Sequence, residues 1–266
     1  MKFARSKQSR RVLTVAAFAT TVSLLGATPF TPGVSYKVRT VMNMPPMPGM
    51  GAGDLVIVGH GVSANGKSRL DIDSAASGPM TPFGPGDYIL TLDSGRTVVV
   101  TPASKTYIDN FMMGGGMPPE VMSQAVISGI SVNVEKQGAG ETIEGRATQK
   151  YKLTAQYTMS IMGTVINMGQ ETEIMTADLP TKIATGLGGS LSKSMSTGPF
   201  AELYTKMTDA QKQISGTPIK VSNVTSIMPM NMNLTQTMTI TDLKNTDVDE
   251  KSFAIPDGFT ARPPGL

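Results

Sequence analysis

The fold is decided by residues 147–161, which read ATQKYKLTAQYTMSI. From Tyr151 to Ile161 every second residue is apolar, and the residues between them are polar. Successive side chains of a strand point to opposite faces, so this pattern predicts a strand with one buried face and one solvated face. Such a strand exceeds the usual length of about 3–10 residues and should be the longest in the protein. A long strand must coil to keep one face covered, which predicts a strongly curved sheet.

Further strands are expected along most of the chain, because the same alternation recurs on both sides of this stretch. Asn65-Gly66 separates two alternating runs and predicts a tight hairpin. The sequence therefore indicates a mainly β protein with one mostly antiparallel sheet. The other expected strands are residues 34–44, 55–61, 68–73, 88–92, 97–101, 130–135, 165–176, 219–228 and 232–243.

One or two helices should complete this α+β fold. Residues 199–214 place their apolar side chains on one helical face, begin with Pro199 and precede Gly216. A second, shorter helix is expected from Pro118 to about Ile127. We expect the helices to pack in the concave face of the curved sheet, within a single domain spanning residues 33–266.

The N-terminus has the pattern of a targeting segment. Five basic residues precede an uncharged stretch from Val12 to Ala27. A basic region followed by a short apolar run is typical of a secretory signal peptide, which we place with a short linker in residues 1–32. The protein is then periplasmic or secreted, with an uncleaved anchor as the alternative. Arg10-Arg11 partly matches a twin-arginine signal, so the export route stays open.

Charge and cysteine content exclude some functions. Of 23 basic and 20 acidic residues, five basic ones lie before Val12, so the rest of the chain has a slight acidic excess. No basic stripe remains for nucleic-acid binding. The absence of cysteine excludes disulfides and thiolate chemistry.

No motif requires an enzyme or a cofactor. Residues 61–68 match the phosphate-binding pattern G-x-x-x-x-G-K-S, but they fall on a predicted hairpin rather than before a helix. Residues 190–193 match S-x-x-K without its companion motifs. His60 is the only histidine and lies on an ordinary strand. The carboxylate pairs Asp71/Asp73 and Glu171/Glu173 fit a solvated sheet face.

Two segments carry a resemblance to a known family. Residues 140–151, GETIEGRATQKY, resemble a hairpin motif of exported bacterial proteins that contain a domain of unknown function and are related to LolA/LolB-like lipoprotein and lipid carriers. Residues 253–259, FAIPDGF, are similar to the ending common in that family. The resemblance implies a curved half-barrel whose concave apolar face holds a lipid or acyl chain. It implies a binding protein or a carrier of the cell envelope, with Tyr151, Leu153, Tyr157 and the apolar face of the helix as cavity wall.

Methionine is the one unusual feature of the composition: there are 20 residues, and ten of them lie in three clusters. Flexible thioether side chains suit the lip of a cavity that accepts variable ligands. The expected lip residues are Met42, Met44, Met112, Met113, Met117, Met228, Met230 and Met232. The expected wall residues are Tyr151, Leu153, Tyr157, Phe200, Leu203 and Met207.

Two other functions remain open. Thioethers are also soft ligands for Cu(I), so Met42, Met44, Met47 and Met50 could form a copper site in an envelope protein. The third alternative is an envelope scaffold without a small ligand. Apart from the ligand, we expect a monomer, with contact to a membrane surface or an envelope protein left open.

Overall fold

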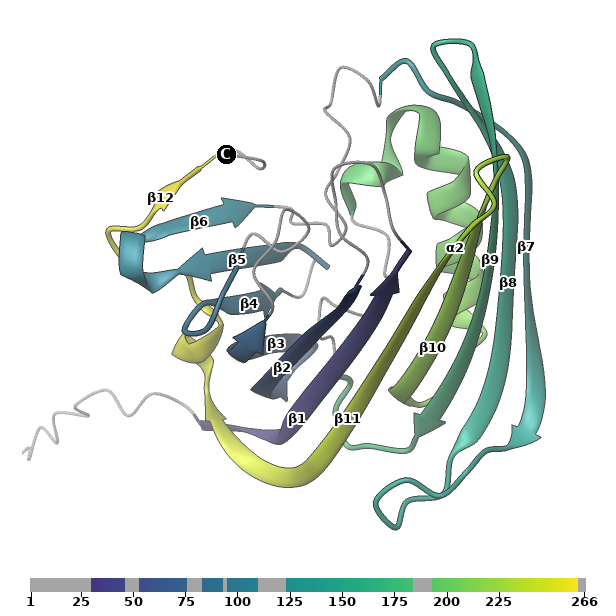
Figure 1. The fold of residues 1–266 in the computed structure, drawn as a ribbon. Coiled ribbons are helices and arrows are strands. Elements are labelled where there is room, and N and C mark those ends of the chain that lie inside the picture. The colour runs from purple at the N-terminus through teal and green to yellow at the C-terminus, as the bar shows by residue number, and fades with distance from the viewer. Residues whose placement is uncertain are drawn as a thin grey trace, which may run out of the picture.

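The computed structural model describes residues 30–45, 53–75, 83–92, 95–109, 123–183 and 193–262. They form one open, curved, twelve-stranded sheet with a single short α-helix in the described part (Figure 1). Every strand pair is antiparallel except β12 with β6, so the expected mainly β, mostly antiparallel fold is confirmed. The strands are β1 (Phe30–Met44), β2 (Gly53–Ala64), β3 (Lys67–Ala75), β4 (Tyr88–Thr91), β5 (Thr97–Thr101), β6 (Thr106–Asp109), β7 (Val126–Ala139), β8 (Gln149–Ile161), β9 (Thr164–Ala177), β10 (Thr217–Met228), β11 (Met232–Asp249) and β12 (Thr260–Ala261).

Strand β1 lies in the middle of the sheet, between β2 and β11. On one side β2 to β6 follow in chain order, and on the other side β11 runs back to β7. The sheet therefore consists of two meanders joined through β1. Because β1 begins at Phe30, residues 30–32 of the expected leader segment lie in this strand, whereas residues 1–29 lie outside the described part.

The stretch that decides the fold forms β8, with Tyr151, Leu153, Ala155, Met159 and Ile161 buried as expected. The expectation that it would be the longest strand is wrong: β8 has 13 residues and β11 has 18. β8 ends at a tight turn, in which Met162 and Gly163 both have positive φ. β11 instead continues past the end predicted for it, because a register shift opposite Ser35 and Lys37 lets it bend and keep pairing with β1.

Glycine allows neighbouring strands to approach closely where the sheet curves. Gly61 of β2 is buried, and a Cβ atom there would lie 2.8 Å from Cζ of Tyr36 and would collide with the carbonyl oxygen of Arg69. At Gly59 the pairing with β3 shifts register, and a Cβ atom would collide with the carbonyl oxygen of Asp71. The Asn65-Gly66 turn joins β2 to β3 as predicted.

The helix α2 (Ala201–Lys212) lies within the predicted range 199–214 and packs next to β7. Leu203, Met207 and Ala210 are buried in the same cluster as Tyr151 and Leu153 of β8, as the helical periodicity predicted. The second predicted helix is wrong at its end, because Val126 and Ile127 belong to β7. A β-branched run pairing with β8 overrides the helix signal there, and residues 118–122 lie outside the described part.

The C-terminal segment covers the outer face of β4 and β5. Ile255 and Phe259 pack against a cluster formed by Tyr88, Leu90, Val98 and Val100, while Phe253 packs with Ala64 and Val248. The FAIPDGF motif therefore makes structural contacts along its length. In the described part of the chain, no helix is long and apolar enough to cross a membrane.

Candidate functional site

The inner face of β9, β10 and β11 carries a row of uncharged polar side chains. We call Gln170, Thr172, Asn223, Thr225 and Gln236 the polar row. Gln170 Nε2 donates to Thr172 Oγ1 at 3.3 Å, Thr172 Oγ1 donates to Asn223 Oδ1 at 3.0 Å, and Asn223 Nδ2 donates to Thr225 Oγ1 at 3.2 Å. The Thr172–Asn223 bond crosses from β9 to β10, so Gln170, Thr172, Asn223 and Thr225 form a connected network.

The register of the sheet places this row on the same face as the core. Thr172 lies opposite Leu153 of β8 on one side and opposite Asn223 on the other. Asn223 lies opposite Gln236, which lies opposite Met42 of β1. Leu153 is buried in the main core, and cross-strand neighbours share one face of a sheet. The polar row is therefore an interruption of an otherwise apolar inner surface.

Burial changes at the polar row. The next row of inward-facing residues, toward the lower end of the sheet in Figure 1, is buried throughout. It consists of Tyr151, Ile174, Val221 and Met238, which lie side by side on four strands. Toward the other end, Met159 and Ile161 of β8 are still buried, but other large apolar side chains are only half-buried. These are Tyr157, Met168, Ile227, Met232 and Leu234. Burial raises the pKa of the Tyr157 hydroxyl. The inner face is therefore only partly covered beyond the polar row, mainly on β9 to β11.

No described inner-facing position of β8 to β11, from the polar row to the strand tips, carries a charged side chain. The amides and hydroxyls can donate and accept hydrogen bonds without a formal charge. Such a surface suits a hydroxyl, ester or amide group and offers no cation for a carboxylate or phosphate. It also contains no acid or base for proton transfer.

Thr40 lies next to this region on β1, opposite Met238. Its side chain is fully buried, and its Oγ1 has no hydrogen-bond partner in the described part of the chain. A buried hydroxyl without a partner costs free energy, about 1–3 kcal/mol. Thr40 is thus a second uncharged polar group on the inner face, adjacent to the polar row.

The predicted wall residues are brought together, but mostly as packed core. Tyr151, Leu153, Phe200, Leu203 and Met207 are buried side chains of the main cluster, and Tyr157 alone among the six stays half-exposed. The half-open surface lies farther along the strands than the sequence reasoning placed it.

The predicted lip residues fall at several places. Met42 is half-buried on the inner face, Met232 is half-buried at the start of β11, and Met228 and Met230 are exposed at the β10–β11 turn. The side chain of Met44 and the whole of residues 112, 113 and 117 lie outside the described part, as do residues 47 and 50 of the alternative copper site. The copper interpretation therefore stays a prediction.

Sequence reasoning missed Met162 and Met168, as well as the polar row. The alternation of β8 and β9 around a turn could have placed Met168 inward and Met162 at a hairpin tip. The polar row could not be found this way, because it depends on the register of several strands.

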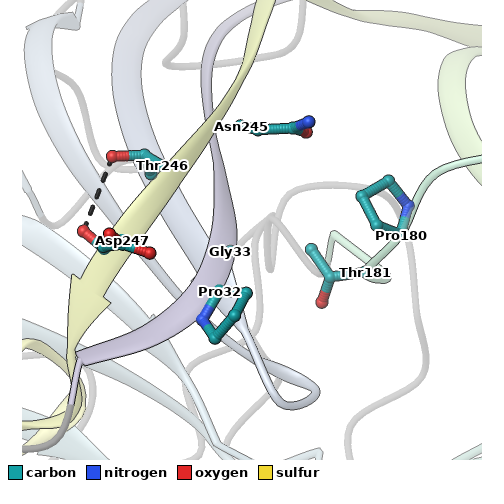
Figure 2. Close-up of a pocket in the computed structure, with 7 residues that line it drawn as sticks. All are labelled: Pro32, Gly33, Pro180, Thr181, Asn245, Thr246 and Asp247. Atoms are coloured by element: carbon teal, nitrogen blue, oxygen red, sulfur yellow. Dashed lines mark hydrogen bonds between the residues drawn. The ribbon is translucent and has the colours of Figure 1, made fainter.

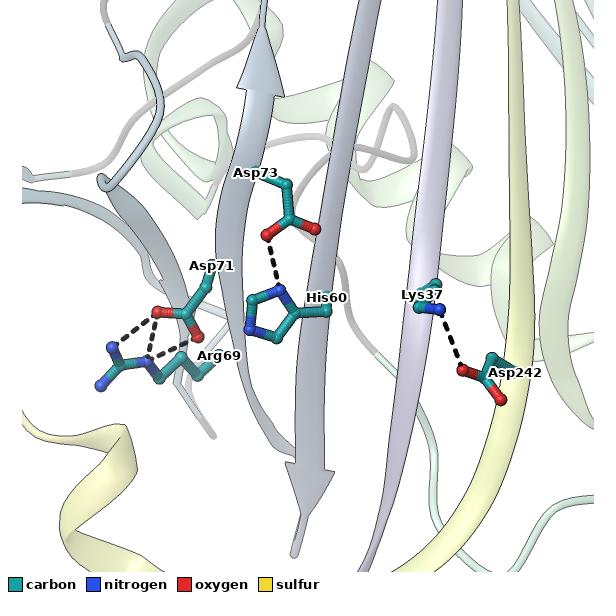
Figure 3. Close-up of polar contacts among 6 residues, drawn as sticks. All are labelled: Lys37, His60, Arg69, Asp71, Asp73 and Asp242. Carbon is teal, nitrogen blue, oxygen red and sulfur yellow. Dashed lines mark hydrogen bonds and ion pairs between the residues drawn. The ribbon is translucent and has the colours of Figure 1, made fainter.

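The outer face carries ion pairs rather than a catalytic arrangement (Figure 3). His60 Nδ1 lies 2.7 Å from Asp73 Oδ1, and both side chains are largely exposed. Arg69 makes a two-pronged contact with Asp71 and stacks on Tyr88 at 3.9 Å from the ring centre. Lys150 and Lys152 pair with Glu173 and Glu171, so both predicted carboxylate pairs lie on a solvated face. The described residues contain no cluster of His, Asp and Glu that could hold a metal ion.

The sequence motifs for phosphate binding and acyl transfer gain no structural support. Residues 61–68 run from β2 through the Asn65-Gly66 turn into β3, without a helix to present backbone amides. Of the S-x-x-K segment, residues 190–192 lie outside the described part.

A pocket of about 380 Å³ lies at the other end of β1 and β11 from the polar row (Figure 2). Its lining is Pro32, Gly33, Pro180, Thr181, Asn245, Thr246 and Asp247. The only charged group among these residues is Asp247, and no histidine, lysine or second carboxylate accompanies it. We assign this pocket no chemical role.

Comparison with known proteins adds no identification: no protein-family model matches the chain, and no curated protein matches it.

Proposed function

We propose that the protein binds an amphiphilic lipid on the inner face of β8 to β11. The acyl chain would lie against the half-exposed apolar side chains, and an uncharged polar group would bind the polar row. One observation carries the proposal: large apolar side chains such as Tyr157, Met168 and Leu234 stay half-exposed beside a connected row of amides and hydroxyls. An apolar surface with a few convergent polar groups is the usual design of a small-molecule site.

The polar row also limits the chemistry of the ligand. In the described part, Gln170 Oε1 has no hydrogen-bond partner, and the Gln170 amide group donates to Thr172. An unpaired amide acceptor can receive a hydrogen bond from a ligand hydroxyl. A charged head group would lose its hydration here without gaining an ion pair, which is unfavourable. The preferred ligand therefore has a hydroxyl, ester or amide group rather than a carboxylate.

The wider architecture is part of the same proposal. We place the protein among half-barrel lipid carriers of the LolA-like class, with α2 seated in the concave face of the sheet and the protein exported to the cell envelope. The curved sheet, the burial of Leu203 and Met207 in the main core and the leader-like residues 1–27 support this assignment. The protein would act by binding and carrying, without catalysis.

The test is a calorimetric titration of delipidated protein with monoacylglycerols of increasing chain length. Each buried CH₂ group contributes roughly 0.8 kcal/mol, so the affinity should rise about fourfold per CH₂ until the site is full. Fatty acids of equal chain length should bind more weakly at neutral pH. Absent or length-independent binding would leave the scaffold interpretation.

Matched variants locate the site on the inner face. Asn223→Leu removes the central group of the polar row and should weaken monoacylglycerol binding about tenfold, which is the usual effect of losing one hydrogen-bonding group. Ser222→Ala is the control, because Ser222 precedes Asn223 on β10 and points to the opposite face. Equal effects of the two substitutions would contradict the inner-face site.

A further inference from the structure

Charge is distributed unevenly along strands β7 to β11. From their upper ends in Figure 1, these strands carry no charged residue until Glu135 of β7, Lys152 of β8, Glu171 of β9, Lys220 of β10 and Asp242 of β11. On β9 the uncharged part covers Thr164 to Gln170, which is roughly 20 Å of strand. One end of the sheet is therefore free of charge on both of its faces.

Exposed apolar side chains gather at this same end. We call Val126, Met162, Val165, Met228 and Met230 the apolar rim. Their exposed fractions are 63% for Val126, 78% for Met162, 53% for Val165, 47% for Met228 and 55% for Met230. Among the described residues, the only other exposed large apolar side chains are Phe30 and Val224.

The register shows that the strand residues of the apolar rim lie near one another on one face of the sheet, separated by single polar residues. Val126 lies opposite Ser160, and Ser160 lies opposite Val165 on β9. Met228 lies opposite Asn167, two residues from Val165 on the same face of β9. Met162 occupies the β8–β9 turn, and Met230 occupies the β10–β11 turn. In Figure 1 the β8–β9 turn lies at the top of the sheet, and the β10–β11 turn lies lower, at the upper end of its own strands.

Among the described residues, the strand positions around the rim are polar and uncharged. The side chains between the apolar ones are Ser, Thr and Asn, as in the row Ser128, Thr158 and Asn167. A charge near this end comes from α2, where Lys206 is paired with Glu202 and donates to the carbonyl oxygen of Ile130 at 2.9 Å. Lys206 is therefore already engaged by the protein.

We propose that the apolar rim docks on the surface of a lipid bilayer. Two projecting turns with flexible apolar side chains suit shallow insertion among lipid acyl chains, whereas a protein partner of this surface would need a complementary groove. Ser, Thr and Asn would face the head groups. Because the rim has no basic cluster, binding depends on apolar contact and does not require anionic lipids. This inference does not depend on the ligand proposed above.

The test measures the co-sedimentation of the protein, as purified from its own cells, with phosphatidylcholine vesicles. We expect binding that is insensitive to salt and falls about tenfold in the variant Met162→Asp/Val165→Asp, because carboxylates resist entry into the bilayer. Gln137→Asp/Thr142→Asp is the matched control, since both residues are exposed at the opposite end of the sheet. The control should bind vesicles as the wild type does.

A fluorescent probe locates the contact directly. The chain has no cysteine, so Met162→Cys and Thr142→Cys each create a single labelling site. A polarity-sensitive dye at residue 162 should shift to shorter wavelength on addition of vesicles, and the same dye at residue 142 should not. Monoacylglycerol affinity of the aspartate variants should equal that of the wild type, since neither rim residue faces the inner site.

Three results would overturn the proposal. The first is vesicle binding that is absent or unchanged by Met162→Asp/Val165→Asp. The second is binding that requires anionic lipid and is lost at high salt. The third is a spectral shift at residue 162 that depends on protein concentration without vesicles, which would make the rim an interface between two copies of the chain.

Discussion

The hydroxyl oxygen of Tyr151 lies 2.6 Å from Oγ of Ser215, and the backbone N–H of Ser215 donates to the same hydroxyl at 3.3 Å. This contact joins β8 to the segment that follows α2. It also lowers the pKa of the Tyr151 phenol, because hydrogen bonds donated by Ser215 stabilise the phenolate. The helix is thus fixed to the sheet by a polar contact as well as by its apolar face.

Tyr151→Phe should lower the free energy of unfolding by about 1 kcal/mol, the usual value of one hydrogen bond. Ser215→Ala should cost a similar amount, and the double variant should cost less than the sum of the two. Chemical denaturation measures all three. Tyr204→Phe is the control, because the hydroxyl of Tyr204 on α2 has no hydrogen-bond partner in the described part. Strict additivity would contradict a direct contact.

Gly61→Ala should destabilise the protein by about 1–3 kcal/mol, because the new methyl group would press on Tyr36 and on the carbonyl oxygen of Arg69. Gly53→Ala provides the comparison on the same strand, since a Cβ atom at Gly53 meets nothing within 4 Å. Thermal unfolding of both variants gives the measurement. A destabilisation at Gly53 as large as at Gly61 would mean that lost flexibility, and not close approach, explains the effect.

Leu153→Asp should lower the free energy of unfolding by more than about 3 kcal/mol, because it places a carboxylate in the main core without a partner. Gln156→Asp introduces the same carboxylate at an exposed position of the same strand. Its free energy of unfolding should stay within about 0.5 kcal/mol of the wild-type value. Urea denaturation compares the two. A tolerated Leu153→Asp would mean that the inner face of β8 is not core.

Acid should weaken the contacts made by Glu250. Its carboxylate accepts hydrogen bonds from Asn65 Nδ2 at 3.0 Å, Lys67 Nζ at 3.3 Å and Thr31 Oγ1 at 3.1 Å, which lower its pKa below the usual 4.5. Since the folded-state pKa is the lower one, the stabilisation is present above pH 4.5 and is lost as the pH falls through the folded-state pKa.

The variant Glu250→Gln should therefore be less stable than the wild type at neutral pH, and the two should converge as the pH falls well below 4.5. Thermal melts between neutral and strongly acidic pH measure this convergence. Asp178→Asn is the control, because Asp178 is exposed and has no ion pair in the described part of the chain. A stability difference between Glu250→Gln and the wild type that stays constant with pH would contradict the assignment.

The alternating strands were the most predictable part of the fold. Residues 151–161, the Asn65-Gly66 hairpin and the apolar face of α2 each follow from local periodicity, which burial of one face enforces. The short strands β6 and β12 were not predicted. β4 is as short as β6, but it was predicted because a turn signal and a second apolar run, residues 97–101, follow it. The central position of β1 was not predicted either, since pairing between distant strands leaves no local signal.

The candidate site was less predictable than the fold. The residues expected as a cavity wall have the right periodicity, but periodicity separates buried from solvated faces and does not separate filled core from open surface. The uncharged runs 153–170 and 221–241 are visible in the sequence. Only the register shows that they lie side by side and form one neutral end of the sheet.

The position of β1 has a consequence for synthesis and folding. Ser35 of β1 contacts Lys244 of β11, 209 positions later in the chain, whereas most other strands pair with sequence neighbours. The two meanders can form from local hairpins. The pairing of β1 with β11, which joins them, can form only after nearly the whole chain has been synthesised. Until then β1 presents an unpaired edge, which other chains could join. A chaperone that protects residues 30–44 during this interval would raise the yield of folded protein more than one that protects the outer strand β7.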